Sequence, residues 1–339
     1  MRATAGLLVG LAFLLGTAGP AAADGGRPSS FESVVDTVNR STPGVRIEVV
    51  GGDAFLSVSA RRGNEVLIPG YDGEPYLRIR RDGVVERNLR SPATYLNTSR
   101  SNQATKLPAA ADSSAAPRWQ PTGGVGQVAW HDHRIHWMTS AVPEPGPGGL
   151  IQNWAVPMTV NGRSVVAEGR LLYRGSTASP LELVWIGLVL AAVTAGTAMV
   201  ARRRNLLHLA LFVGATIALG LSWAAFRANP PDSGASLLPV LVAVGALLLV
   251  AAAPGLPRVP LALGSAATLV GWAVVRSAVL WKPVLPTSLP GWIDRVGTAT
   301  VLGIGIGAAW VLVRHPAGVA QADGPDGPDG PGEELPPAP

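Results

Sequence analysis

The chemistry-bearing side chains of this chain gather in one short segment, residues 130–138, with the sequence WHDHRIHWM. Three of the five histidines in the chain, His131, His133 and His136, lie within six residues of one another there. Neutral imidazole is the commonest metal ligand in proteins and suits copper, zinc, iron and nickel. The segment therefore predicts a metal site, and copper is favoured over zinc because Met138 adds a soft thioether.

Four other side chains of this segment bear on its role: Trp130, Asp132, Arg134 and Trp137. Asp132 is suited either to bind a metal or to orient a metal-binding histidine. A strand places His131 and His133 on one face and His136 on the other, whereas a helix makes only His133 and His136 neighbours. A metal site therefore needs a turn after Arg134 or ligands from elsewhere. Two other interpretations are a buried polar network and a segment that changes charge between pH 5 and 8.

Two further segments combine aromatic, polar and basic side chains. Residues 73–78 predict a turn that enters a strand, and residues 90–97 predict an irregular polar loop. The residues of interest there are Glu74, Tyr76, Arg78, Arg90, Tyr95 and Asn97. With the neighbouring arginines they form the densest basic region of the chain. This charge favours an anionic envelope ligand, such as lipid headgroups or a wall polymer; the alternative is a solvated strand face beside Asp82 and Glu86.

The composition indicates a membrane protein. The chain has 339 residues, of which 47% are hydrophobic and 14% charged, against about 25% charged in soluble proteins. It has no cysteine, which excludes a disulfide scaffold, a cysteine-ligated metal site and a cysteine nucleophile. The sequence contains no P-loop, zinc-protease or nucleophile-elbow pattern. We therefore expect no enzyme, and with a net charge of only +5 we expect no nucleic-acid partner.

The N-terminal half predicts an exported β-domain. Residues 1–23 predict a signal peptide, with Arg2 before an apolar stretch and an Ala-rich cleavage site; an uncleaved anchor is the alternative. Residues 24–178 predict an extracytoplasmic all-β domain, an immunoglobulin-like β-sandwich, because short strands alternate with Gly, Pro, Asn and Asp turns. The expected strands are 45–50, 55–60, 66–68, 76–80, 84–87, 125–130, 154–160 and 164–173.

The C-terminal half predicts an α-helical transmembrane bundle, residues 181–313. About five spans are expected, at 181–200, 206–226, 237–253, 260–280 and 296–313, and four is the alternative. A span needs about 20 apolar residues to cross a core of about 30 Å. Three arginines at 202–204 follow the first span and place that loop in the cytoplasm. Five spans then leave residues 314–339, an acidic Pro- and Gly-rich tail, disordered in the cytoplasm.

Two features within the expected spans also carry predictions. Arg276 is the charged residue that lies furthest inside an expected span, and we expect its side chain to extend to the outer membrane surface. Gly303, Gly305 and Gly307 superficially resemble a nucleotide-binding loop, but in a span such small residues predict close helix packing.

The segments EPYLR (74–78), RSPATYLN (90–97) and WHDHRIHWM (130–138) resemble an uncharacterised family of actinobacterial secreted, multi-pass membrane proteins. The resemblance covers residues 30–175 well and the spans in outline. It implies a signal peptide, a β-rich extracytoplasmic domain and membrane spans, but no activity. We therefore expect a cell-membrane protein whose β-domain binds a ligand or an envelope partner. The alternative is extracytoplasmic copper handling by residues 130–138.

Overall fold

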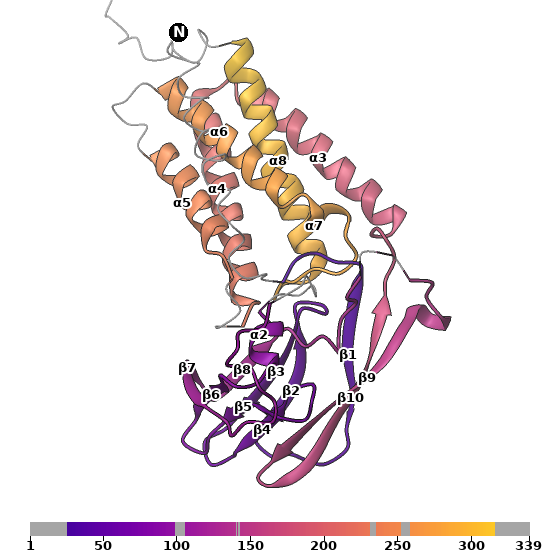
Figure 1. The fold of residues 1–339 in the computed structure, drawn as a ribbon. Helices are drawn as coiled ribbons and strands as arrows, with labels where there is room; N and C mark the ends of the chain where they lie inside the picture. Colours follow the sequence, from indigo (N-terminus) through magenta and orange to yellow (C-terminus); the bar gives the residue numbers. More distant parts are fainter. Residues whose placement is uncertain are drawn as a thin grey trace, which may run out of the picture.

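The computed structural model describes residues 26–98, 106–139, 141, 143–230, 235–251 and 258–315. The expected signal peptide and the tail beyond residue 315 lie outside these ranges. Figure 1 shows a β-region built from the first part of the chain and a bundle of helices built from the rest. This order confirms the division into an N-terminal β-domain and a C-terminal helical part.

The β-region consists of two antiparallel sheets. The larger sheet has the strand order β1-β10-β9-β4-β5-β6-β7, and the smaller has the order β2-β3-β8. The strands are β1 (Phe31–Val38), β2 (Val45–Val50), β3 (Phe55–Ala60), β4 (Val66–Pro69), β5 (Pro75–Ile79), β6 (Val84–Asn88), β7 (Trp119–Val125), β8 (Gln127–Trp130), β9 (Leu150–Val160) and β10 (Arg163–Tyr173). Immunoglobulin constant domains place four strands on three. This division into seven and three strands does not confirm an immunoglobulin-like fold.

The alternating sequence explains the best-predicted strands. In β9, Trp154, Val156 and Met158 are buried while the residues between them are exposed, as expected when one face of a strand packs on a core. The hairpin to β10 turns at Asn161 and Gly162, both with positive φ, which favours a tight two-residue turn. The sequence analysis missed β1 and β7, because β1 alternates weakly and β7 contains a proline and two glycines.

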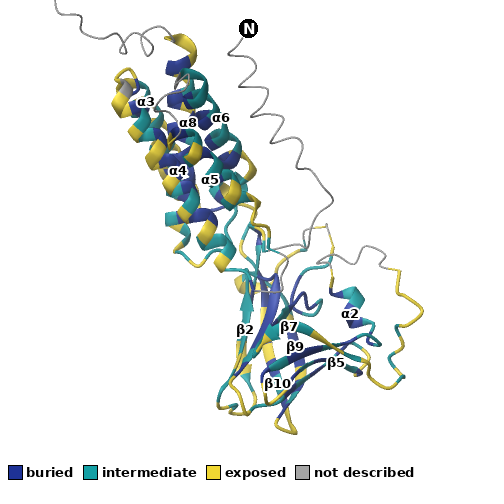
Figure 2. Cartoon of the chain, turned by 90° about the vertical axis from the view of Figure 1, so that its left-hand side faces the viewer, coloured by how far each residue is buried: buried dark blue, intermediate teal, exposed yellow. Residues whose placement is uncertain are grey.

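The helical part contains three helices that are long and apolar enough to cross a membrane: Pro180–Val200, Asn205–Arg227 and Gly291–Arg314. Two apolar helices are shorter, Leu238–Ala251 and Val259–Val275. The helices are α3 (Pro180–Val200), α4 (Arg204–Arg227), α5 (Leu238–Ala251), α6 (Arg258–Val275), α7 (Ala278–Trp281) and α8 (Gly291–Arg314); α2 (Ala93–Leu96) and the 3-10 turn η1 (Pro147–Gly149) belong to the β-region. Figure 2 shows buried residues inside the bundle and exposed ones along its outside. Many exposed residues are large and apolar, as a lipid-facing surface requires.

The fourth expected span differs from the structure. Helix α6 ends at Val275, and the short helix α7 follows after Arg276 and Ser277. Arg276 does not extend to the surface as expected: its guanidinium forms an ion pair of 2.7 Å with Asp294 of α8 and lies 5.1 Å from the centre of the Trp272 ring. Asp294 is only 2% exposed. Helix α8 begins at Gly291, before the residue 296 expected from the sequence, so its first turn carries Asp294 to Arg276.

The segment after α7 holds the β-region against the helices. Ser29 and Val284 form an isolated antiparallel bridge, with N–H···O distances of 2.9 and 3.2 Å. Lys282 Nζ donates to the Ser30 hydroxyl at 3.1 Å. The Ala178 backbone N–H donates to the carbonyl of Trp281 at 2.6 Å. The residues just before β1 and the end of the β-region are therefore both tied to α7 and the loop that follows it.

Candidate functional site

Asp132 organises the segment that the sequence analysis singled out. Its carboxylate is fully buried and accepts a hydrogen bond from Trp130 Nε1 at 2.8 Å. It also accepts the backbone N–H of Arg134 at 3.0 Å and two guanidinium hydrogen bonds at 2.8 and 2.6 Å. Asp132 thereby folds the chain into a turn after strand β8, because four donors converge on its two oxygens. This is the buried polar network that we considered as one interpretation.

The turn brings the ring of His136 near the rings of both other histidines. The rings of His133 and His136 lie 5.4 Å apart between centres, and those of His131 and His136 lie 6.5 Å apart. His131 stacks on Phe55 and its Nδ1 lies 2.7 Å from the carbonyl oxygen of Ala54. No group of three or more His, Asp or Glu side chains suited to hold a metal ion occurs among the residues that the structure describes. Of the other expected ligands and neighbours, Met138 and Trp137 are half-buried.

Tyr71 and Asn97 join this turn to the second motif segment. The Tyr71 hydroxyl donates to Asn97 Oδ1 at 2.5 Å and accepts the backbone N–H of His133 at 3.0 Å. The Arg134 guanidinium lies 5.2 Å from the centre of the Tyr71 ring. One phenol therefore links the end of α2 with the histidine segment.

Glu74 joins the first motif segment to the second. Its carboxylate is 5% exposed, accepts a hydrogen bond from the Ser91 hydroxyl and accepts the backbone N–H of Asp72 at 3.1 Å. A Cβ on Gly70 would lie 1.9 Å from Glu74 Oε1, so any larger residue there would displace the Glu74 carboxylate. The three motif segments thus meet in one region between the sheets.

Burial affects the ionisation of this region. It raises the pKa of the Tyr71 phenol, and the negative charge of Asp132 acts in the same direction. Burial also raises the pKa of Tyr76, against the opposing effect of a hydrogen bond with Asn97. Burial lowers the pKa of Arg134, but the hydrogen bonds and charge of Asp132 outweigh this effect and raise it. At neutral pH the two phenols are therefore neutral and Arg134 carries its charge beside Asp132.

A cavity of about 230 Å³ lies beside this region, and we call it the inter-sheet cavity. All three motif segments contribute to its wall: Tyr76 from the first, Thr94 and Asn97 from the second, Trp130 and His131 from the third. The complete lining is Phe55, Tyr76, Leu77, Arg87, Thr94, Asn97, Thr98, Thr122, Val128, Ala129, Trp130 and His131. Ligand sites are mostly apolar clefts with a few polar groups, and this cavity fits that description.

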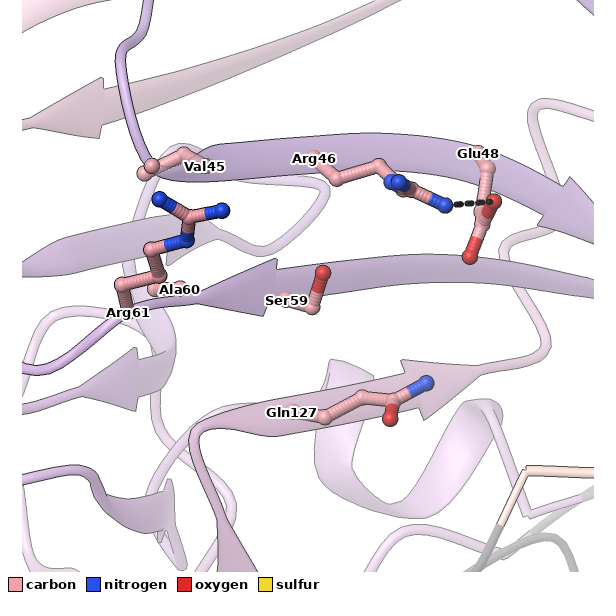
Figure 3. A pocket seen from close by; sticks show the side chains of 8 residues that line it. Val45, Arg46, Glu48, Ser59, Ala60, Arg61 and Gln127 are labelled. Carbon is pink, nitrogen blue, oxygen red and sulfur yellow. Dashed lines mark ion pairs between the residues drawn. The ribbon is translucent and has the colours of Figure 1, made fainter.

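A second hollow lies on the outer face of the small sheet, shown in Figure 3. Its lining is polar, and Arg46 and Glu48 along β2 approach each other to 4.0 Å. Both side chains are well exposed, at 76% and 44%. Because these exposed charges can pair with each other, they offer a ligand little binding free energy. The inter-sheet cavity is therefore the stronger candidate.

The remaining motif residues lie outside the cavity. Arg78 forms a two-donor ion pair with Glu86 on the other face of β5 and β6 and lies 4.4 Å from the centre of the Trp119 ring. The Tyr95 hydroxyl donates to the carbonyl of Leu89 at 2.9 Å. The Arg90 backbone N–H donates to Asn88 Oδ1 at 2.9 Å. These residues hold strands and loops together, so the basic region is not one continuous patch around the cavity.

The sequence assigned no role in this region to Phe55 and Tyr71, and it placed Arg87 and Ser91 only within the basic region and the segment 90–97. Phe55 looked like an ordinary strand residue, and Tyr71 lies in a turn with no motif around it. Arg87 carried a usable signal, because it falls at the inward position of an alternating strand, where a charge is unusual.

Comparison with known proteins found no match: no family model, no curated protein and no solved structure is significantly similar to this chain. The assignment of a function therefore depends on the geometry alone.

Proposed function

We propose that this protein is a non-enzymatic binding protein of the cell envelope, in which a membrane-anchored β-domain presents the inter-sheet cavity to a ligand outside the cytoplasm. One observation carries the proposal: three segments far apart in the sequence converge on one mostly apolar cavity of about 230 Å³. Membership in the actinobacterial family remains a prediction.

The proposal includes the arrangement in the membrane. Five crossings, by α3, α4, α5, α6 and α8, place the β-domain outside and the C-terminus in the cytoplasm. The basic loop between α3 and α4 then lies inside, as the positive-inside rule favours. The apolar exterior of the helices supports contact with a lipid bilayer.

Single cysteines test this arrangement, because the chain has none of its own. Arg61→Cys on the β-domain and Arg202→Cys after α3 both replace exposed side chains. We expect a membrane-impermeant maleimide to label Arg61→Cys in intact cells and Arg202→Cys only after permeabilisation. Labelling of Arg202→Cys in intact cells would refute the orientation.

A panel of small anionic, neutral and cationic compounds tests the cavity. We expect at least one compound to raise the melting temperature of the detergent-solubilised protein. Thr98→Trp fills the exposed rim of the cavity and should abolish that shift. Thr37→Trp, exposed on β1 outside the cavity, should retain it. The absence of any shift, or an equal shift in both variants, would exclude a ligand site here.

A second candidate function is extracytoplasmic copper handling, with zinc less favoured. The 5.4 Å between the rings of His133 and His136 supports it, because two imidazoles on one metal with bonds of about 2.0 Å have ring centres about 5–6 Å apart. Calorimetry with Cu²⁺ and Zn²⁺ should then show binding that His133→Ala and His136→Ala each remove. No heat with either ion at neutral pH would end this hypothesis.

A further inference from the structure

Arg87 faces the interior of the β-domain. In the antiparallel register of β5 and β6, Leu77 lies opposite Arg87 and Ile79 lies opposite Val85. Cross-strand partners share a face of the sheet, and residues two apart in a strand share it as well. Leu77, Ile79 and Val85 are at most 3% exposed, so this is the core face. Arg87 lines the inter-sheet cavity from that face.

The other polar side chains of the cavity wall each have at least one protein partner. Trp130 Nε1 donates to Asp132 at 2.8 Å. The Thr94 hydroxyl donates to the carbonyl of Asn88, and the Thr98 hydroxyl to the carbonyl of Tyr95, both at 2.6 Å. The Thr122 hydroxyl, the Asn97 amide oxygen and His131 Nδ1 also have partners. These contacts hold the wall together.

Arg87 differs from them. Within the described part of the chain, its guanidinium forms no ion pair and no side-chain hydrogen bond. No carboxylate occurs among the described residues that line the cavity, and the nearby Asp132 is already paired with Arg134. A partly buried cation without a partner costs free energy, which an anionic ligand would offset through charge-assisted hydrogen bonds.

We propose that the inter-sheet cavity binds a small organic anion, with its carboxylate on the Arg87 guanidinium and an apolar, aromatic body against Trp130 and Phe55. This inference rests on the proposed function, since it names the ligand class for the same cavity. A volume of about 230 Å³ lies below the range of drug-sized sites and suits a ligand of about ten non-hydrogen atoms.

Isothermal titration of the detergent-solubilised full chain with three ligands of one shape tests the charge. The probes are 3-phenylpropanoate, its neutral amide and the 3-phenylpropylammonium cation. We expect the carboxylate to bind at least tenfold more tightly than the amide, and the cation not at all. Arg87→Gln should weaken carboxylate binding at least tenfold, whereas Arg163→Gln, an exposed arginine of β10, should not change it.

Arg87→Lys separates a lost ligand contact from a lost fold. It keeps the charge without the planar fork of donors, so it should retain part of the affinity that Arg87→Gln loses, while both keep the wild-type melting temperature. Equal binding of carboxylate and amide, or unchanged binding in Arg87→Gln, would overturn the anion inference and leave the cavity as a site for a neutral ligand. If none of the three probes binds, the anion inference is also overturned, and the compound panel then decides the proposed function by itself.

Discussion

Asp132 shows how much one buried carboxylate can organise. It is fully buried, and its two oxygens accept hydrogen bonds from the indole of Trp130 and from the backbone and guanidinium of Arg134. Asp36 makes a similar two-donor pair with Arg170, at 2.8 Å for both hydrogen bonds, but on the surface. The two pairs share their chemistry and differ in exposure to water.

This difference predicts unequal effects of the same substitution. Asp132→Asn should lower the free energy of unfolding by about 3 kcal/mol, because it leaves a partly buried guanidinium without its counter-charge. Asp36→Asn should cost much less than Asp132→Asn, since exposed pairs contribute little. Urea unfolding of the detergent-solubilised chain, followed by near-ultraviolet circular dichroism, measures both. Equal costs would mean that burial of Asp132 has no energetic consequence.

The buried phenols predict a dependence on alkaline pH. Burial raises the pKa values of Tyr71 and Tyr76 above the ordinary value of about 10. The stabilisation from their neutral forms is therefore complete below pH ~10 and is lost as the pH rises through the higher folded-state values. The melting temperature should fall above pH ~10, and Tyr71→Phe and Tyr76→Phe should each flatten that fall. An identical fall in both variants would assign it to other groups.

Helix packing in the bundle depends on small residues of α8, as the glycine spacing predicted. A Cβ on Gly307 would lie 2.7 Å from the carbonyl oxygen of Thr194 in α3, and a Cβ on Gly305 would lie 2.8 Å from the Val270 side chain in α6. Alternate glycines of α8 thus allow neighbours on two sides to approach closely. By contrast, Gly187 of α3 is exposed, with no atom within 4 Å of such a Cβ.

These contacts predict opposite outcomes for two glycine substitutions. Gly307→Leu should separate α3 from α8 and lower the melting temperature in detergent by several degrees. Gly187→Leu should leave it within error, because the added side chain projects away from other helices. Differential scanning fluorimetry on the tryptophans of the chain compares them. Tolerance of Gly307→Leu would show that α3 and α8 do not pack as closely as in this structure.

At the scale of the whole molecule, the bridge between Ser29 and Val284 determines how the β-domain meets the helices. Directly paired residues of such a bridge have Cα atoms about 5.5 Å apart, which is within the range of a disulfide. The double variant Ser29→Cys, Val284→Cys should therefore cross-link under mild oxidation and shift in mobility on non-reducing electrophoresis. Each single variant is the matched control and should not shift. No intramolecular cross-link would mean that the two parts are not docked through this loop in the membrane.

Local sequence patterns were enough to predict most of the helices and strands. Alternating apolar residues and turn-forming pairs such as Asn161-Gly162 predicted most strands, because those signals act between neighbouring residues. Apolar length predicted the helices for the same reason, with the last one placed five residues late. For the histidine segment, a buried polar network was one of three interpretations that the sequence allowed, and the structure shows such a network around Asp132.

Which of these elements contact one another depends on the packing of the whole chain. Three hydrogen-bonded pairs join residues that lie 17 to 26 positions apart in the sequence: Tyr71 with Asn97, Glu74 with Ser91, and Arg276 with Asp294. Such contacts depend on sheet register and helix packing, which no local pattern specifies. The sequence presents Arg87 as one basic residue among many. The register of β5 and β6 places it on the core face, where it lines a mostly apolar cavity. A site made by distant segments becomes visible only when the packing that brings them together is known.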